Sequence, residues 1–74
     1  MKLNELKQGQ SAKIVNISGA AATKRRLMEL GLTKNAVIII KKTAPLGDPL
    51  ELHVRGYELT IRKKDAAGID VVKV

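Results

Sequence analysis

Six glycines and two prolines divide this 74-residue chain into short segments, and this punctuation limits the folds open to it more than any other feature. Glycine and proline interrupt helices and mark turns, so short segments between them favour strands. The sequence therefore predicts a fold that consists mainly of β-strands. The interrupting residues are Gly9, Gly19, Gly31, Pro45, Gly47, Pro49, Gly56 and Gly68.

The length and composition indicate one small domain over residues 1–74. A chain of this size buries only roughly 60% of the surface that its unfolded form exposes. Its 22 valines, isoleucines and leucines are enough for a small core, and without cysteine it has neither disulfides nor thiolate metal ligands. The N-terminal residues are too polar for a signal peptide and no apolar run is long enough to span a bilayer, so we expect a cytoplasmic protein without direct membrane insertion.

A single helix is predicted over residues 20–30, where alanines and long side chains follow one another without a proline. Leu27 and Leu30 form its apolar side, and Ser18 is the expected N-terminal cap. Gly31 is expected to end the helix in a left-handed conformation, with the next leucine packed back on the last turn. The remaining elements are expected to be strands and turns.

Five β-rich segments surround this helix. The run over residues 37–40 is apolar throughout, which predicts a strand covered on both faces. Residues 50–55 alternate and predict a half-buried strand with Glu51, His53 and Arg55 on its charged outer face. We expect a loop at 44–49, where Gly47 allows the turn, and one helical turn at 63–68. The predicted fold class is all-β with one short helix: a small antiparallel barrel of about five strands with the helix after the first. The expected strands are 11–17, 37–40, 50–55, 58–62 and 69–74.

The net charge of +7 predicts attraction to an anionic partner, for which nucleic acid, an acidic membrane surface and an acidic protein all qualify. Tyr57 is the only aromatic residue, so the chain lacks the rings on which single-stranded nucleic acid stacks. This shortage argues against nucleic acid as the partner.

Catalytic chemistry lacks its usual residues. A triad around the single histidine, His53, would need Ser11 or Ser18 nearby, so we expect no enzyme and no cofactor. Glu51 and His53 lie two apart on a predicted strand and share a face, which makes them weak candidates for metal ligands. Two ligands are too few for a divalent ion, and a solvent-facing charged stripe is the favoured interpretation.

Two exposed features are candidate partner contacts. Arg25 and Arg26 belong to a basic helix face, which is either a solubilising surface or a docking face, and Met28 lies beside the predicted buried seam as an adaptable apolar contact. Leu46 stands between two prolines, so it either closes one end of the barrel or points outward. The candidate partner-binding residues are Arg25, Arg26, Met28 and Leu46.

Two motifs and their spacing give the chain a family resemblance. Residues 25–32 read RRLMELGL, residues 45–49 read PLGDP, and both stand ahead of the hairpin with Val54-Arg55-Gly56-Tyr57 and the strand Leu59-Thr60-Ile61-Arg62. In this order they resemble the ferrous iron transport protein A (FeoA) family, and the resemblance covers essentially the whole chain.

The resemblance implies an SH3-like barrel that works with the large ferrous iron transporter FeoB, whose cytoplasmic part is a GTPase. It therefore implies a cytoplasmic accessory or regulatory protein that docks on that part of FeoB and has no substrate of its own. A similar domain forms the C-terminal part of iron-dependent repressors, so a metal-sensing domain stays as an alternative. A basic nucleic-acid-binding barrel is the other alternative.

Overall fold

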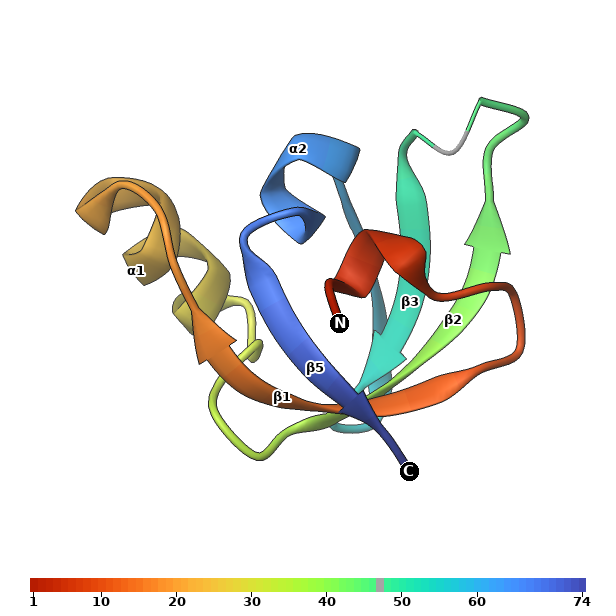
Figure 1. The fold of residues 1–74 in the computed structure, drawn as a ribbon, viewed down its shortest axis with the longest axis horizontal. Helices are drawn as coiled ribbons and strands as arrows, with labels where there is room; N and C mark the ends of the chain where they lie inside the picture. Colours follow the sequence, from red (N-terminus) through yellow and green to blue (C-terminus); the bar gives the residue numbers. More distant parts are fainter. Residues whose placement is uncertain (47) are drawn as a thin grey trace.

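The five strands form one antiparallel sheet in the order β4-β3-β2-β1-β5, and the sheet curls into a small barrel (Figure 1). This computed structural model describes residues 1–46 and 48–74. The predicted fold class is confirmed, with the one longer helix inserted after the first strand. The elements are η1 (Leu3–Glu5), β1 (Ser11–Ile17), α1 (Ala21–Glu29), β2 (Val37–Thr43), β3 (Leu50–Val54), β4 (Tyr57–Ile61), α2 (Lys63–Ala66) and β5 (Ile69–Lys73).

Alternate residues of the strands fill the interior of the barrel. On β3, Leu50, Leu52 and Val54 are buried, whereas Glu51 and His53 between them lie on the outer face. This alternation is the period-two pattern of a sheet with one covered face. Leu27 of α1 joins the same core, so the helix packs on the barrel through the side that its spacing predicts.

The prediction that residues 37–40 form a strand covered on both faces is wrong. Val37 is 49% exposed and Ile39 is half-buried, while Ile38 and Ile40 are buried. The sheet is antiparallel and has solvent on its outer side, so an apolar run does not require two covered faces. The strand also continues beyond Ile40 to Thr43, with a register shift between Ile40 and Lys42.

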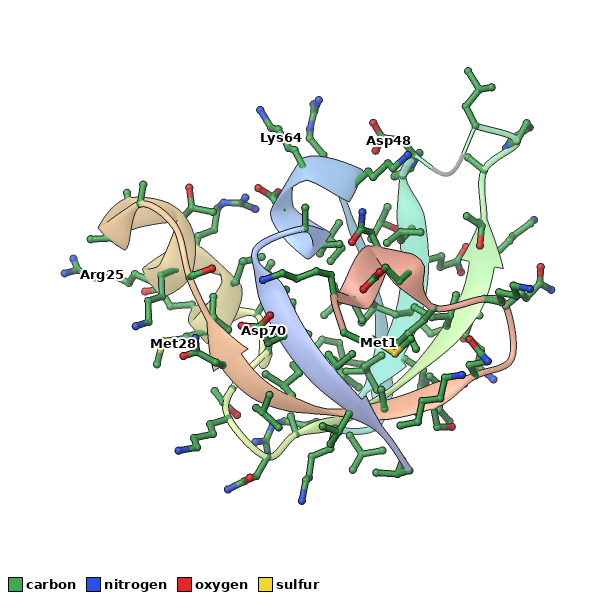
Figure 2. The ribbon with its side chains drawn as sticks, in the orientation of Figure 1. Met1, Arg25, Met28, Asp48, Lys64 and Asp70 are labelled. Carbon is green, nitrogen blue, oxygen red and sulfur yellow. The ribbon has the colours of Figure 1, made fainter. Side chains whose placement is uncertain are left out.

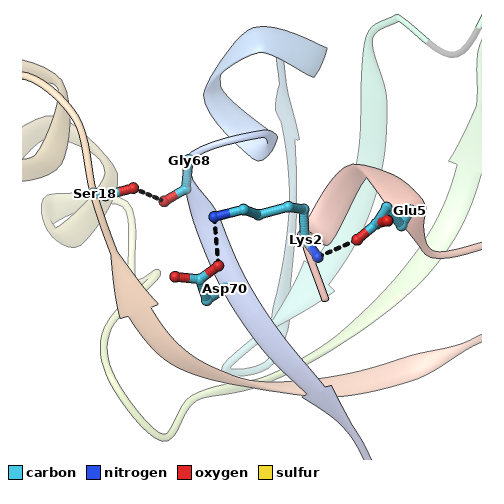
Figure 3. A network of polar contacts seen from close by, with 5 residues as sticks. All are labelled: Lys2, Glu5, Ser18, Gly68 and Asp70. Atoms are coloured by element: carbon cyan, nitrogen blue, oxygen red, sulfur yellow. Dashed lines mark hydrogen bonds and ion pairs between the residues drawn. The ribbon is translucent and has the colours of Figure 1, made fainter.

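The two ends of α1 are fixed in different ways. At the C-terminal end Gly31 has φ +102°, its N–H donates to the carbonyl of Met28, and the N–H of the buried Leu32 donates to the carbonyl of Leu27. This is the predicted Schellman ending. The prediction that Ser18 caps the start is wrong: Ala20 holds the cap position, and the hydroxyl of Ser18 donates to the carbonyl of Gly68 at 3.0 Å (Figure 3).

The N-terminal segment packs into the barrel, where the sequence patterns predicted no element. Leu3 of η1 and Leu6 after it are buried, and η1 contacts α2 and β5. The Lys2 ammonium lies 2.6 Å from the Asp70 carboxylate on β5 (Figure 3), and its hydrogen bond and positive charge hold the pKa of Asp70 below its usual value. The N-terminus is thereby tied to the last strand. Among the described residues, no helix combines the length and apolar character that a bilayer crossing requires.

The β3–β4 hairpin reaches across to the end of α1. Arg55 and Gly56 form its two-residue turn, both with positive φ, so Arg55 does not belong to the charged face of β3 as its alternation predicted. Its guanidinium donates to the carbonyl of Gly31 at 3.2 Å and to the hydroxyl of Thr33. A positive charge at a helix C-terminus stabilises the helix, so Arg55 serves as an additional cap for α1.

Candidate partner-binding surface

The outward side of α1 carries Arg25 and Met28, which both point away from the barrel (Figure 2). The two residues are three apart, and residues with that spacing share one face of a helix. Met28 is 45% exposed, although its neighbour Leu27 is buried in the core. The predicted exposure of Met28 is therefore confirmed, and the residue offers a flexible apolar side chain beside a cation.

Arg26 has a different environment from Arg25. Its guanidinium donates to the Asp65 carboxylate of α2 at 2.9 Å, and only 9% of the Asp65 side chain is exposed. Arg26 therefore links α1 to α2 and is less available to a partner than Arg25. No local pattern reveals this ion pair, because its two residues lie 39 positions apart in the sequence.

Two shallow hollows flank Met28, and both are lined by Met28 and Lys24. One, of about 450 Å³, lies along α1 and is completed by Ala21, Arg25, Glu29 and Thr33. The other, of about 170 Å³, lies between α1 and β1 and is completed by Val15, Asn16, Ile17 and Lys34. No sequence pattern indicates Val15 or Lys34, since only the folded chain brings β1 and the segment after α1 alongside Met28.

Leu46 belongs to a separate surface. Its side chain is 88% exposed, so of the two predicted orientations the outward one is correct. The loop that carries it joins β2 to β3 on the side of the molecule away from α1 (Figure 1). The Asp48 carboxylate accepts a hydrogen bond from the N–H of Lys63 at 3.0 Å and ties this loop to α2. The turn expected at Gly47 lies outside the described residues.

Glu51 and His53 lie on the outer face of β3, as their spacing predicts. His53 is opposite Glu58 and Glu51 is opposite Thr60 on β4, and the buried Nδ1 of His53 has no hydrogen-bond partner among the described residues. Over those residues no three acidic, histidine or cysteine side chains lie close enough to hold one ion. Two donors do not complete a divalent site. Among the described residues, the pair therefore has no third such side chain beside it.

The serines do not form a triad with His53. Ser11 is opposite Ile39, which is in turn opposite His53, so two strand spacings, roughly 10 Å, separate the serine from the histidine. Ser18 donates its hydroxyl to Gly68 instead. In the part of the chain that the structure describes, neither serine therefore lies beside the one histidine.

The curled five-stranded sheet and its inserted helix define the class of protein, a small SH3-like β-barrel. A procaryotic SH3 domain protein, the zinc-complexed FeoA of Stenotrophomonas maltophilia, matches the chain with a TM-score of 0.83 and 29% identity, over 97% of this chain and 89% of that one. The model of the FeoA domain matches residues 1–73. The chain therefore belongs to the FeoA family, as its motifs predicted.

Two further relatives extend the comparison. The solution structure of the FeoA protein from Chlorobium tepidum has a TM-score of 0.93 and 43% identity, and the match covers all of this chain and 70% of that one. A fusion of Fe(2+) transport protein A with the transporter FeoB from Porphyromonas gingivalis is 35% identical over 71 residues, which is 96% of this chain. The chain spans only 8% of that fusion's length.

A manganese-dependent transcriptional repressor shares the fold, with a TM-score of 0.91 over 36% of its own length. Its sequence is only 16% identical to this chain. The likeness therefore concerns the barrel alone and carries no argument for metal sensing.

Proposed function

We propose that this chain is a non-enzymatic accessory protein of ferrous iron uptake that docks on the cytoplasmic part of the transporter FeoB. The observation that carries the proposal is the Porphyromonas gingivalis relative, in which an FeoA-like segment and FeoB are one polypeptide. Covalent linkage holds two modules at a high effective concentration, an arrangement that favours modules that bind each other. A separate chain of the same family would reach FeoB by surface recognition in the cytoplasm.

The surface chemistry supports docking. The net charge of +7 favours an acidic partner surface. Arg25 and Met28 offer charge and an adaptable apolar contact together, and the exposed Leu46 offers an apolar contact on a second surface. Arg26 also belongs to the docking face, but its contribution to binding is smaller because its guanidinium already donates to Asp65.

The distribution of positive charge gives less support to nucleic acid. Lys24 and Arg25 lie on α1, Lys41 and Lys42 on β2, and further cations on α2. Figure 2 shows nitrogen-tipped side chains on several sides of the molecule. A nucleic-acid site gathers its cations along one path that follows the phosphates.

The test is a binding titration of this chain against the purified cytoplasmic part of FeoB from the same organism, at near-physiological salt of about 150 mM. We expect saturable binding, and an unrelated protein of similar acidity serves as the control for charge alone. Equal binding to the control, or no binding to either the cytoplasmic part or detergent-solubilised FeoB, would contradict the proposal. A gel-shift titration with duplex DNA at the same salt tests the nucleic-acid alternative, which requires binding that weakens steeply as salt rises.

A further inference from the structure

The two hollows beside Met28 share Lys24 and Met28, and we name them together the Met28 groove, defined by Val15, Lys24, Arg25, Met28, Glu29 and Lys34. We propose that this groove receives an acidic peptide segment that inserts one large apolar side chain next to Met28. The inference rests on the proposed function, because it assigns the segment to the cytoplasmic part of FeoB.

The geometry supplies an apolar centre within a charged border. Met28 lines both hollows, and the surface around it in the larger one is mainly carbon, from Ala21 and the stems of Lys24 and Arg25. That hollow is shallow and has a volume of about 450 Å³. Methionine is unbranched and polarisable, so it adapts to an inserted side chain. The groove thus suits one aliphatic or aromatic group.

The charges of the groove are unbalanced. Lys24, Arg25 and Lys34 border it, and Glu29 is the acidic residue that lines it. In the described part of the chain the ion pairs are Lys2 with Asp70 and Arg26 with Asp65, so none of the three bordering cations is paired there. An acidic segment would supply the missing negative charge.

The direction of Arg26 limits binding of the acidic segment to the groove side of α1. Its guanidinium turns to the opposite side of α1, toward Asp65, and leaves the unpaired charge of the helix on the Met28 side. The combination of apolar centre and cationic border fits a peptide better than a nucleic acid, because phosphates would use the cations but leave Met28 without a partner. No aromatic ring lines either hollow, so bases would have nothing to stack on.

The experiment measures affinity for the cytoplasmic part of FeoB with three versions of the full chain besides the parent. Met28→Ala removes the apolar centre. The double variant Lys24→Glu with Lys34→Glu reverses two of the positive charges that border the groove. The matched control, Lys7→Glu with Lys42→Glu, makes the same charge change at exposed positions outside the groove. Circular dichroism and melting temperatures establish that every variant is folded.

We expect Met28→Ala to weaken binding about tenfold, mainly through faster dissociation. The Lys24/Lys34 reversal should weaken it about tenfold or more and flatten its salt dependence, whereas the Lys7/Lys42 control should lose no more than about threefold. Overlapping peptides that cover the cytoplasmic part of FeoB should then locate the segment: captured peptides should carry net negative charge and a large apolar residue, and the Met28→Ala protein should capture them poorly.

The outcomes separate the two proposals. If FeoB binds and the groove variants bind as the parent does, the groove assignment is wrong while the proposed function stands. If FeoB does not bind in any form, both fail. A duplex DNA or single-stranded RNA oligonucleotide that binds at about 150 mM salt, and loses that binding in the Lys24/Lys34 variant, would identify the groove as a nucleic-acid site and overturn the inference.

Discussion

The phenol of Tyr57 at the start of β4 lies directly over Gly31 at the end of α1. A Cβ at position 31 would overlap the Tyr57 hydroxyl, and Gly31 also has φ +102°, a conformation that side chains disfavour. The hairpin and the helix therefore meet at a position whose backbone conformation favours glycine, and the exposed Tyr57 ring would have to shift to admit a side chain there.

We expect Gly31→Ala to cost about 1–2 kcal/mol of unfolding free energy, chiefly through the backbone conformation. For a domain of this size that loss lowers the melting temperature by roughly 4–16 °C. The two causes can be separated with Tyr57→Phe, which removes the overlapping oxygen. If Gly31→Ala lowers the melting temperature of the parent but not that of the Tyr57→Phe protein, crowding by the hydroxyl and not the backbone conformation is the cause.

Leu27→Ala tests the packing of α1. Leu27 is 1% exposed, so truncation should leave a cavity and cost about 2–5 kcal/mol, a large part of the stability of a small domain. Met28→Ala, one residue along the same helix, should stay within about 0.5 kcal/mol of the parent because Met28 is at the surface. Chemical denaturation measures both values. Equal stability of the two variants would mean that the helix does not pack as the structure has it.

Arg25→Glu and Arg26→Glu should differ, although the residues are adjacent. Arg25→Glu should slow association with the cytoplasmic part of FeoB several-fold at low salt and leave the melting temperature unchanged. Arg26→Glu would place two carboxylates together, since Asp65 is its present partner, and should cost up to about 1 kcal/mol of stability. Stopped-flow association rates and melting curves of the two single variants give the comparison.

Acid should weaken the link between the N-terminus and β5. Lys2 lowers the pKa of Asp70, so the ionised carboxylate is favoured in the folded state. The contribution of this pair to stability is therefore complete above the ordinary pKa of an aspartate, roughly 4, and disappears as the pH falls through the lower folded value.

Asp70→Asn tests this dependence. We expect it to destabilise the protein at pH 7, and the difference between the two proteins to shrink as the pH falls through the lowered pKa of the Asp70 carboxyl. Urea midpoints at several pH values measure the gap between the two proteins. Lys2→Met should give the same pH profile if the pair is the cause, and a gap that is constant down to the lowest pH would contradict the assignment.

Leu46→Ala should leave stability unchanged, because the side chain is 88% exposed. If the loop is part of the docking surface, the variant should dissociate from the cytoplasmic part of FeoB several-fold faster at the parental association rate. An unchanged dissociation rate would remove Leu46 from the proposed contacts and leave the α1 face as the one docking surface to pursue.

The sequence predicted the elements whose signals are local. The bounds of β1 are those read from its β-branched residues, and the helix end at Gly31 follows from the requirement for a positive φ. The outward direction of Met28 follows from helical spacing. These features depend on residues within one or two turns of each other, which is the range over which a sequence pattern acts.

The features that the sequence missed depend on contacts between distant residues. Ser18 suits a helix cap by type, but the nearby carbonyl of Gly68 takes its hydroxyl. Arg26 resembles Arg25 in every local respect and differs only because α2 brings Asp65 beside it. Val15 joins the groove because the fold places β1 and α1 on either side of one hollow. Since these partners lie far along the chain, only the folded structure could reveal them.

The attachment of α1 determines what a bound partner can do to this protein. The chain before the helix is tied to Gly68 through Ser18, its middle to Asp65 through Arg26, and its end to the hairpin through Arg55. Two of these contacts reach the segment 65–68 and the third comes from the hairpin, so both ends of the helix are tied to the barrel. A protein that binds this helix would therefore fix the orientation of the whole barrel. Docking would orient the molecule without changing its conformation.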